Sequence, residues 1–435
     1  MTLKSMVSNN NTLNPWTPQD EGDHYPIVKE WWTIETIFKT LEDNKKWNFM
    51  TIISYKMKPP GSFFQYTLFD INSKKCILRK DIDAEIEKLH HEKNKVDLGY
   101  EDSTVKGLYP DYDVNIIDKE KNFQIDLKLK AKSLPHWVAQ EATEGKLPIG
   151  LNYYKYGFIP NCDLSGRMKL KNNDYTIKGK GYFEHIWGNW SYENPLQVVS
   201  GIKKTFSTYL NLGKWWLSNH KPKIPDKIKF TTENDVSGYD WIWGIFDNDW
   251  SLFYGNVMFW VSEGPAFGVL SITPDGKNYW DFCNINFHYN KCIYVKNYDI
   301  FIPSDLEISG KLNDKKIYLH FWLTTDSYEY IDPFKKKGFY KAFILGEMPG
   351  QVEGAYEDSE KKIDLKGDCK MMPLRQPSIL GHNSLCFKFI KPPKGFGLDI
   401  DLNSHYLKKK FLTKIHFAPR PKIKCDIKKL KEEEF

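Results

Sequence analysis

The stretch GKGYFEHIWGNW, residues 179–190, places Glu184 next to His185 inside a run of aromatic residues. A carboxyl group that burial keeps protonated near neutral pH can protonate a carbon–carbon double bond. Aromatic ring faces stabilise the carbocation that follows, and a second polar group such as His185 or a tyrosine can orient water and accept a proton. The stretch therefore predicts acid–base chemistry on an apolar substrate or, alternatively, a packed core with one buried polar pair.

Strand geometry separates the acid from the imidazole. Successive side chains of a β-strand point to opposite faces, so Glu184 shares a face with Tyr182, and His185 shares the other with Phe183 and Trp187. We expect one of the two groups to face a cavity and the other to face the outside or a domain interface.

The candidate site residues fall into two groups. We predict that Glu184, His185 and Tyr154 are catalytic. The residues predicted to bind the substrate are Glu30, Trp31, Trp32, Tyr153, Trp187, Trp241 and Trp243. The structural alternative is that Glu30 is a buried, paired carboxylate and that the tryptophans fill the floor of a barrel. We expect neither a metal nor a cofactor, because the chain has no phosphate-binding loop, no dinucleotide fingerprint and no convincing set of metal ligands.

The elements that must position these residues are short strands. NFQIDLKLKAK (122–132) alternates apolar and polar residues, and 163–185 reads as two strands joined by an Asn-Asn-Asp turn. Segment 251–282 repeats the pattern with a turn at Asp275-Gly276. The clearest helix candidate is DIDAEIEKLHHEKN (81–94). The pattern predicts an all-β protein with few short helices.

A chain of 435 residues is too long for one ordinary core, so we expect two domains. KEWWTIETIF (29–38) and YDWIWGIFDNDWSLF (239–253) read as the starts of two similar β units. The predicted organisation is a disordered tail (1–19), a first barrel (20–192), an aromatic and basic connector or lid (193–235), a second barrel (236–420) and a charged tail (421–435).

Several of these motifs together resemble a known family. They are DEGDHYPIVKEWW (20–32), the segment 151–190 with its Glu-His-x-Trp-Gly ending, DWIWGIF (240–246) and FILGEMPGQVEGAYE (343–357). The chain resembles the hydroxyneurosporene synthase family of lipocalin-like proteins, which includes carotenoid 1,2-hydratases, kievitone hydratase and lipocalin-type Diels–Alderases. It departs from the family pattern at Thr33, where an aromatic residue is frequent, and at Glu184, where Asp is common.

The resemblance implies two lipocalin-like antiparallel β-barrels packed together. It also implies a cofactor-independent lyase or isomerase acting on a lipophilic substrate, for example an isoprenoid, by hydration of a prenyl double bond or by cyclisation. In a cyclase, shape and proximity would carry the rate. Two other classes stay open, namely a non-catalytic carrier of a hydrophobic molecule and a scaffold without a ligand.

Composition limits the partners. The net charge is +6, from 62 basic and 56 acidic residues, and no nucleic-acid motif stands out, so we expect a hydrophobic small molecule and no nucleic acid. Residues 200–220 mix lysines with aromatic residues and could contact a membrane surface, cover a pocket or pack as a connector. Seven scattered cysteines and the lack of a leader or a long apolar run favour a cytoplasmic protein, membrane-peripheral at most. Substrate identity and oligomeric state stay open.

Overall fold

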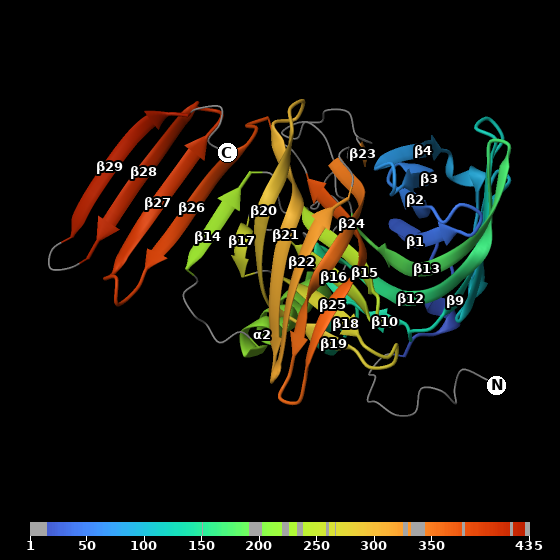
Figure 1. Ribbon diagram of the computed structural model, residues 1–435, viewed down its shortest axis with the longest axis horizontal. Coiled ribbons are helices and arrows are strands. Elements are labelled where there is room, and N and C mark those ends of the chain that lie inside the picture. Colours follow the sequence, from blue (N-terminus) through green and yellow to red (C-terminus); the bar gives the residue numbers. More distant parts are fainter. Residues whose placement is uncertain are drawn as a thin grey trace. The chain divides into compact units, whose positions relative to one another are not determined.

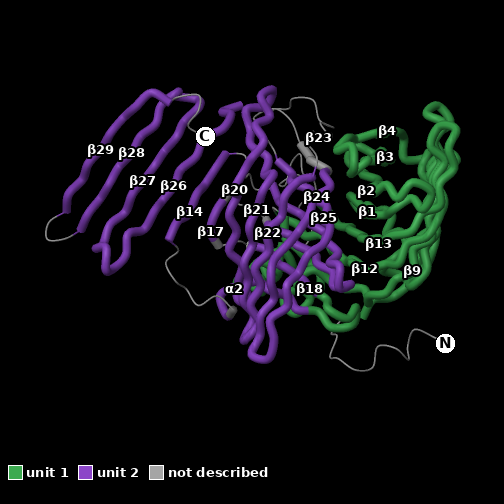
Figure 2. The backbone as a smooth tube through the Cα atoms, in the orientation of Figure 1, with its two compact units in different colours: residues 1–213, 273–279 green, residues 214–272, 280–435 purple. Residues whose placement is uncertain are grey.

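The computed structural model, drawn in Figure 1, describes most of the chain. The described residues are 15–149, 151–190, 202–219, 226–232, 238–257, 261–265, 267–324, 329–331, 344–375, 379–417 and 421–430. The chain divides into unit 1, residues 1–213 with 273–279, and unit 2, residues 214–272 with 280–435 (Figure 2). Each unit is built on an antiparallel sheet, so the predicted all-β class with few short helices is confirmed.

The sheet of unit 1 curls around a core. Its strands, in spatial order, are β4 (Lys75–Ala84), β3 (Pro60–Asp70), β2 (Lys46–Met57), β1 (Lys29–Thr40), β13 (Asn173–Gly188), β12 (Asn152–Leu170), β9 (Phe123–Ala131), β8 (Asp111–Asp118), β7 (Ser103–Leu108), β6 (Val96–Tyr100) and β5 (Leu89–His90). The short strands β10 (His136–Trp137) and β11 (Lys146–Ile149) pair with β12. The terminal strands β4 and β5 are joined directly through the 3-10 helix η3 (Ile86–Lys88), so the sheet must bend round to bring its two ends together.

The helix predicted at 81–94 is wrong. Residues 75–84 form strand β4, followed by η3 and by β5. Ile82, Ala84 and Ile86 pack at intervals of two residues against the core, which is the period of a strand and not of a helix.

The period of two also decides which side chains face the core of unit 1. Strand β9 alternates buried and more exposed residues along most of its length. Trp32 and Ile34 of β1 lie in the same core cluster as Phe183 and Trp187 of β13. Even-numbered residues of β1 and odd-numbered residues of β13 therefore face inward near the site.

Unit 2 contains a longer sheet. Its strands, in spatial order, are β19 (Trp280–Phe282), β18 (Phe267–Thr273), β16 (Ser251–Val257), β15 (Tyr239–Phe246), β25 (Lys362–Arg375), β24 (Ile344–Glu357), β22 (Lys315–Leu323), β21 (Ile300–Leu312), β20 (Asn284–Val295), β17 (Val261–Pro265), β14 (Lys227–Thr231), β26 (Asn383–Ile390), β27 (Gly397–Ser404), β28 (Lys409–His416) and β29 (Lys422–Lys429). A further strand, β23 (Glu329–Ile331), pairs with β24. Residues such as Ile242, Leu252 and Phe321 fill the core of this unit.

The segments expected to be irregular contain regular structure. Within the expected connector, helix α2 spans Ile202–Asn219 and β14 pairs with β17 and β26, while 193–201 lies outside the described residues. Within the expected C-terminal tail, residues 422–429 form β29, which pairs with β28 along its whole length.

The expected N-terminal tail also contributes to the structure. Trp16 is buried against Trp137, with ring centroids 4.8 Å apart, and η2 spans Pro18–Asp20. A further short helix is α1 (Gln140–Thr143). In the part of the chain that the structure describes, no helix has the length and apolar character needed to cross a membrane.

Candidate functional site

The pairing of β1 with β13 places two polar clusters on opposite faces of these strands. Thr33 lies opposite Glu184, and Trp32 lies opposite His185. Because neighbouring residues alternate faces, His185 points into the core of unit 1 and Glu184 points to the other side of the sheet. The predicted separation of the two groups is therefore observed, and each group has its own set of partners.

The Glu184 cluster surrounds one carboxyl group with four donors. Oε1 of Glu184 accepts hydrogen bonds from Trp31 Nε1 at 3.2 Å and from Thr33 Oγ1 at 3.0 Å. Oε2 accepts from the hydroxyl groups of Tyr156 at 2.5 Å and Tyr182 at 2.8 Å. These residues come from three adjacent strands, β1, β12 and β13, so the sheet itself fixes the cluster.

Burial dominates the acidity of Glu184. The side chain is 2% exposed, and loss of hydration raises the pKa of Glu184 although the four hydrogen bonds oppose this. A carboxyl group in this setting keeps its proton to higher pH than a free glutamic acid does. When Glu184 is protonated, it can donate to Tyr156 in place of accepting, since a phenol oxygen can do either.

Aromatic rings stand beside the Glu184 cluster. The ring of Trp190 lies 5.3 Å from that of Trp31 and 5.1 Å from that of Tyr154. The ammonium group of Lys29 is 5.3 Å from the centroid of Trp31 and 5.9 Å from that of Trp190. These ring faces therefore already accommodate one positive charge.

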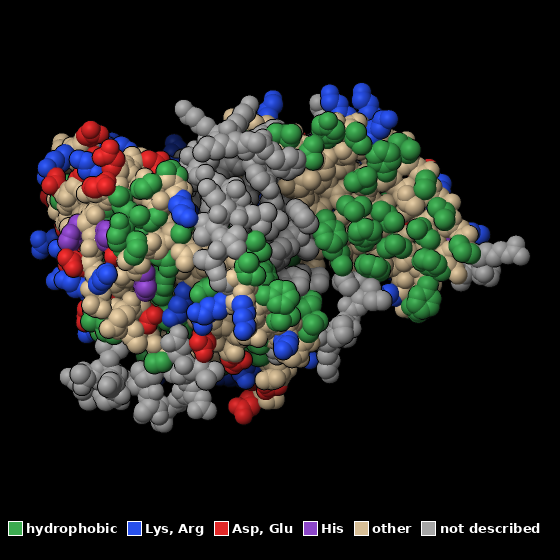
Figure 3. Space-filling view, turned by 180° about the vertical axis from the view of Figure 1, so that it is seen from behind, with side chains coloured by type: hydrophobic (Ala, Val, Ile, Leu, Met, Phe, Trp, Pro, Cys, Tyr) green, Lys and Arg blue, Asp and Glu red, His purple; other side chains and the backbone are tan. Residues whose placement is uncertain are grey.

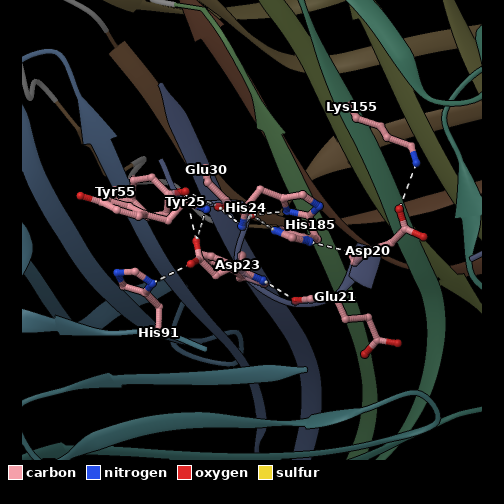
Figure 4. Close-up of polar contacts among 11 residues, drawn as sticks. Asp20, Glu21, Asp23, His24, Tyr25, Glu30, Tyr55, His91, Lys155 and His185 are labelled. Carbon is pink, nitrogen blue, oxygen red and sulfur yellow. Dashed lines mark hydrogen bonds and ion pairs between the residues drawn. The ribbon is translucent and has the colours of Figure 1, made fainter. Parts of the chain in front are cut away.

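The second cluster, centred on His185 and Glu30, lies on the core face (Figure 4). His185 Nδ1 is 2.7 Å from the backbone oxygen of Asp20, and its Nε2 is 2.8 Å from Oε1 of Glu30. A carbonyl oxygen can only accept, so Nδ1 carries a proton. The contact between Nε2 and Oε1 then requires a further proton between them, which the pair shares.

Glu30 has more donors than His185 alone. The backbone N–H of His24 donates to Oε2 at 3.0 Å, His24 Nδ1 lies 2.8 Å from Oε1, and the Tyr55 hydroxyl donates to Oε2 at 2.5 Å. Burial raises the pKa of Glu30, but the hydrogen bonds and charges of His185 and His24 outweigh it and lower the pKa to about 2.

This network continues outward to a half-exposed histidine. The Tyr55 hydroxyl also lies 3.2 Å from Oδ1 of Asp23, whose Oδ2 is 2.9 Å from His91 Nδ1 (Figure 4). Tyr55, Asp23 and His91 were not predicted as site residues. Asp23 lies in the acidic run seven residues before Glu30, but the spacing of residues does not show that Tyr55 lies opposite Glu30 on β2 or that His91 reaches Asp23.

Glu21 is a second buried acid that the sequence analysis passed over. Its carboxylate accepts from Trp16 Nε1 at 2.9 Å, the Tyr112 hydroxyl at 2.9 Å and the Tyr109 backbone at 3.0 Å. Burial raises the pKa of Glu21 to about 7 although these bonds lower it. The acidic run DEGD at 20–23 was the available signal, but sequence does not say that Glu21 and Asp23 are buried and that Asp20 is not.

One group of side chains has the composition of a metal site. His24, Glu30 and His185 offer ligand atoms within 4.8 Å of one another, and two imidazoles with a carboxylate suit zinc or iron. In the structure both imidazoles lie 2.8 Å from the same oxygen, Oε1 of Glu30. The expectation that the protein needs no metal stays a prediction.

The remaining predicted residues have varied positions. Trp32 stacks on His185 at 4.6 Å and Trp187 stacks on His24 at 4.1 Å, so both belong to the core-face cluster. Tyr154 is half-buried on the Glu184 side, and Tyr153, its neighbour on β12, points the other way. Burial, with the nearby Glu184 charge, raises the pKa of Tyr154.

Trp241 and Trp243 lie in unit 2. Both are buried on β15, on the face opposite Ile242, which belongs to the core of that unit.

Comparison with known proteins gives matches in structure only. No protein-family model matches the sequence, and no curated protein matches it significantly. The structure is similar to that of a protein provisionally named ATTH from Nitrosomonas europaea, with 13% identity, a TM-score of 0.56, and coverage of 82% of this chain and 97% of that one. It is also similar to kievitone hydratase from Nectria haematococca, with 11% identity, a TM-score of 0.51, and coverage of 82% and 98%. At these identities the likeness establishes a shared fold.

Proposed function

We propose that the protein is a cofactor-independent lyase or isomerase that acts on a lipophilic small molecule, with Glu184 as its acid. The observation that carries this proposal is the Glu184 cluster, in which a buried carboxyl group with a raised pKa stands beside ring faces that accommodate a cation. Such a group is suited to protonating a carbon–carbon double bond.

For hydration, the reaction balances with water alone. The proton of Glu184 is transferred to one carbon of the double bond, whose electron pair forms the new C–H bond. The cation on the other carbon is stabilised by the rings of Trp31 and Trp190 and is captured by water. The proton that water releases returns to the Glu184 carboxylate, so the acid is regenerated.

The substrate class is proposed to be an isoprenoid or another molecule with a prenyl-like double bond. Protonation of such a bond gives a tertiary cation, which is the cation that aromatic faces can hold long enough to be captured. The fold shared with kievitone hydratase, whose name denotes water addition, supports a lyase but does not transfer its substrate. Cyclisation uses the same protonation, followed by capture of the cation by a second double bond and loss of a proton from the new cation to the Glu184 carboxylate.

The second candidate is a non-catalytic carrier. The carboxylate of Glu184 has four donors, which is also how a structural buried carboxylate is stabilised. In a carrier the aromatic residues would bind the ligand and Glu184 would hold three strands together.

Contact with a membrane surface through α2 would supply a lipophilic substrate. Ile202, Phe206, Leu210 and Leu217 are each at least 49% exposed and recur on one side of the helix. Lys203 and Lys214 flank this stripe and are exposed. An apolar stripe bordered by lysines is the pattern of a helix that lies in a lipid interface.

The test uses a panel of prenylated and polyene compounds in water enriched in oxygen-18. A hydratase should give a product that gains one water carrying the heavy oxygen. Glu184→Gln should lower turnover by roughly 10²–10⁴-fold, the usual contribution of a positioned acid, and leave the Kd for the compound unchanged. The matched control is Glu21→Gln, another buried acid of the same unit.

Two results would contradict the proposal. Turnover that survives in Glu184→Gln would remove Glu184 as the acid. A protein that binds one of the compounds tightly and never converts it would favour the carrier.

A further inference from the structure

Strands β14 and β26–β29 continue the sheet of unit 2 beyond its packed core (Figure 1). β28 and β29 have no fully buried residue, and Ile423 and Ile427 of β29 are 67% and 64% exposed. Among the residues that the structure describes, this part of the sheet is a single layer whose side chains on both faces are mostly half-buried or exposed. A single layer cannot bury its own apolar face, and stable sheets pack that face against a second layer.

The register of these strands gathers apolar side chains on one face. A row across the sheet runs from Ile228 through Phe387 and Ile400 to Thr413 and Cys425. In the neighbouring rows on the same face, the strands carry leucine, isoleucine and phenylalanine. None of the residues in these rows is fully buried. Figure 3 shows hydrophobic side chains gathered broadly over this side of the molecule. We call this surface the open apolar face.

The opposite face of the same strands is charged. Lys388, Lys414, Lys424 and Lys428 alternate with the apolar residues and are exposed, with Asp399 and Asp401 between them. Most of the positive charge therefore points away from the open apolar face, where it could not meet an anionic lipid surface. This distribution of charge is expected for a sheet whose charged face stays in water while its apolar face is covered by protein.

The free edge at β29 is protected against pairing with another strand. Four of its eight residues are lysines. An antiparallel second copy of β29 added along this edge would place lysines near lysines, and such like-charge pairs destabilise a sheet. Association through the face is therefore favoured over association through the edge.

We propose that a second copy of this chain covers the open apolar face, by stacking the same five strands face to face around a two-fold axis. Two sheets packed in this way lie about 10 Å apart, as in a β-sandwich. Four of these strands have eight residues and β14 has five, so they present a footprint of roughly 24 Å by about 26 Å at most, or about 600 Å² before side-chain relief is counted. Stable dimers bury about 600–1,000 Å² on each partner, so the face lies at the lower end of the required size. The same patch serves both partners, as a two-fold interface demands.

The test is the mass of the intact protein in solution as its concentration is varied. We expect sedimentation velocity to give twice the chain mass of 51.2 kDa at micromolar concentration. Ile415→Lys, on the open apolar face of β28, should give the monomer mass and weaken association by at least about ten-fold, because each dimer then buries two unpaired charges. The matched control is Leu412→Lys, on the charged face of the same strand, which should leave the dimer intact. Thr413→Lys replaces Ile415→Lys if circular dichroism shows that the first variant does not fold.

Cys425 is a native reporter on the same face. It is exposed in the isolated chain, so its alkylation should slow as the protein concentration rises, while Cys292, exposed on β20, should react at a constant rate. A monomer at every concentration overturns the proposal, and so does equal loss of association in both lysine variants. If the wild type is monomeric but floats with lipid vesicles and Ile415→Lys does not, lipid and not a second copy covers the face.

Discussion

Tyr156 and Tyr182 both donate to Oε2 of Glu184, so their hydroxyl groups set how readily that acid loses its proton. Removing a donor to a carboxylate leaves the anion less stabilised and raises the pKa of the acid further. Tyr156→Phe should therefore extend the acid form of Glu184 to higher pH, and Tyr182→Phe, which removes a longer bond, should do so less.

The readout is the infrared band of the protonated carboxyl group, taken as the difference from Glu184→Gln, across a pH titration. Tyr66→Phe is the control, since Tyr66 donates to Asp118 elsewhere in the unit. A band that titrates at the same pH in all variants would mean that these hydroxyl groups do not control Glu184.

Glu21 makes stability depend on pH. Its folded pKa of about 7 lies above the ordinary 4.5, so the folded state binds this proton more tightly. The resulting stability is fully present below pH 4.5 and is lost as pH rises through about 7. The shift corresponds to roughly 3 kcal/mol at most.

Glu21→Gln, which stays neutral, should lose less stability than the wild type between pH 5 and 8, as measured by urea unfolding at each pH. Glu141→Gln, at an exposed position, serves as the control. Parallel pH dependences in wild type and Glu21→Gln would contradict the raised pKa.

Helix α2 is the element with the most specific prediction. Phe206→Ser combined with Leu210→Ser removes two exposed apolar side chains from its stripe. Binding to vesicles that contain anionic lipid should weaken by on the order of ten-fold, from the apolar area no longer buried in the interface. Asn211→Ser, exposed on the same helix, should bind as the wild type does.

If α2 is instead a connector packed on protein, the two serine substitutions would lower the free energy of unfolding and leave vesicle binding unchanged.

At the scale of the whole molecule, unit 2 contains a buried ion pair that we call its anchor. In unit 2, Nη2 of Arg375 lies 2.8 Å from Oδ1 of Asp240, and Nη1 donates to the Tyr239 backbone at 3.0 Å. Both side chains are almost fully buried, so Arg375→Met would leave an unpaired buried carboxylate. We expect a loss of about 3–5 kcal/mol in the free energy of unfolding.

Hydrogen exchange should locate this loss in β15 and β25, which carry the two residues. Arg79→Met, which breaks a more exposed ion pair with Asp81, should cost about 1 kcal/mol or less. Equal effects of the two substitutions would mean that the Arg375 pair is not a buried anchor.

The sequence by itself determined the class of the fold and the two faces of the GYFEH strand. A period of two is a local property, since neighbouring side chains of a strand must point apart, and this placed Glu184 with Tyr182 and His185 with Trp187. The same reasoning failed at 81–94, where charged residues between Ile82, Ala84 and Ile86 resemble a solvated helix face. It also missed β29, because alternating lysines resemble a tail until a neighbouring strand supplies hydrogen bonds.

Only the tertiary structure decided which groups meet. Tyr156 reaches Glu184 through the register of β12 on β13, Tyr55 lies directly opposite Glu30 in the register of β2 on β1, and His24 bonds to Glu30 from the segment that precedes β1. The acidities follow from these encounters, because burial raises the pKa of Glu184 and Glu21 while two histidines lower that of Glu30. A pKa depends on hydration and on neighbours distant in the sequence, and neither is encoded in the local spacing of residues.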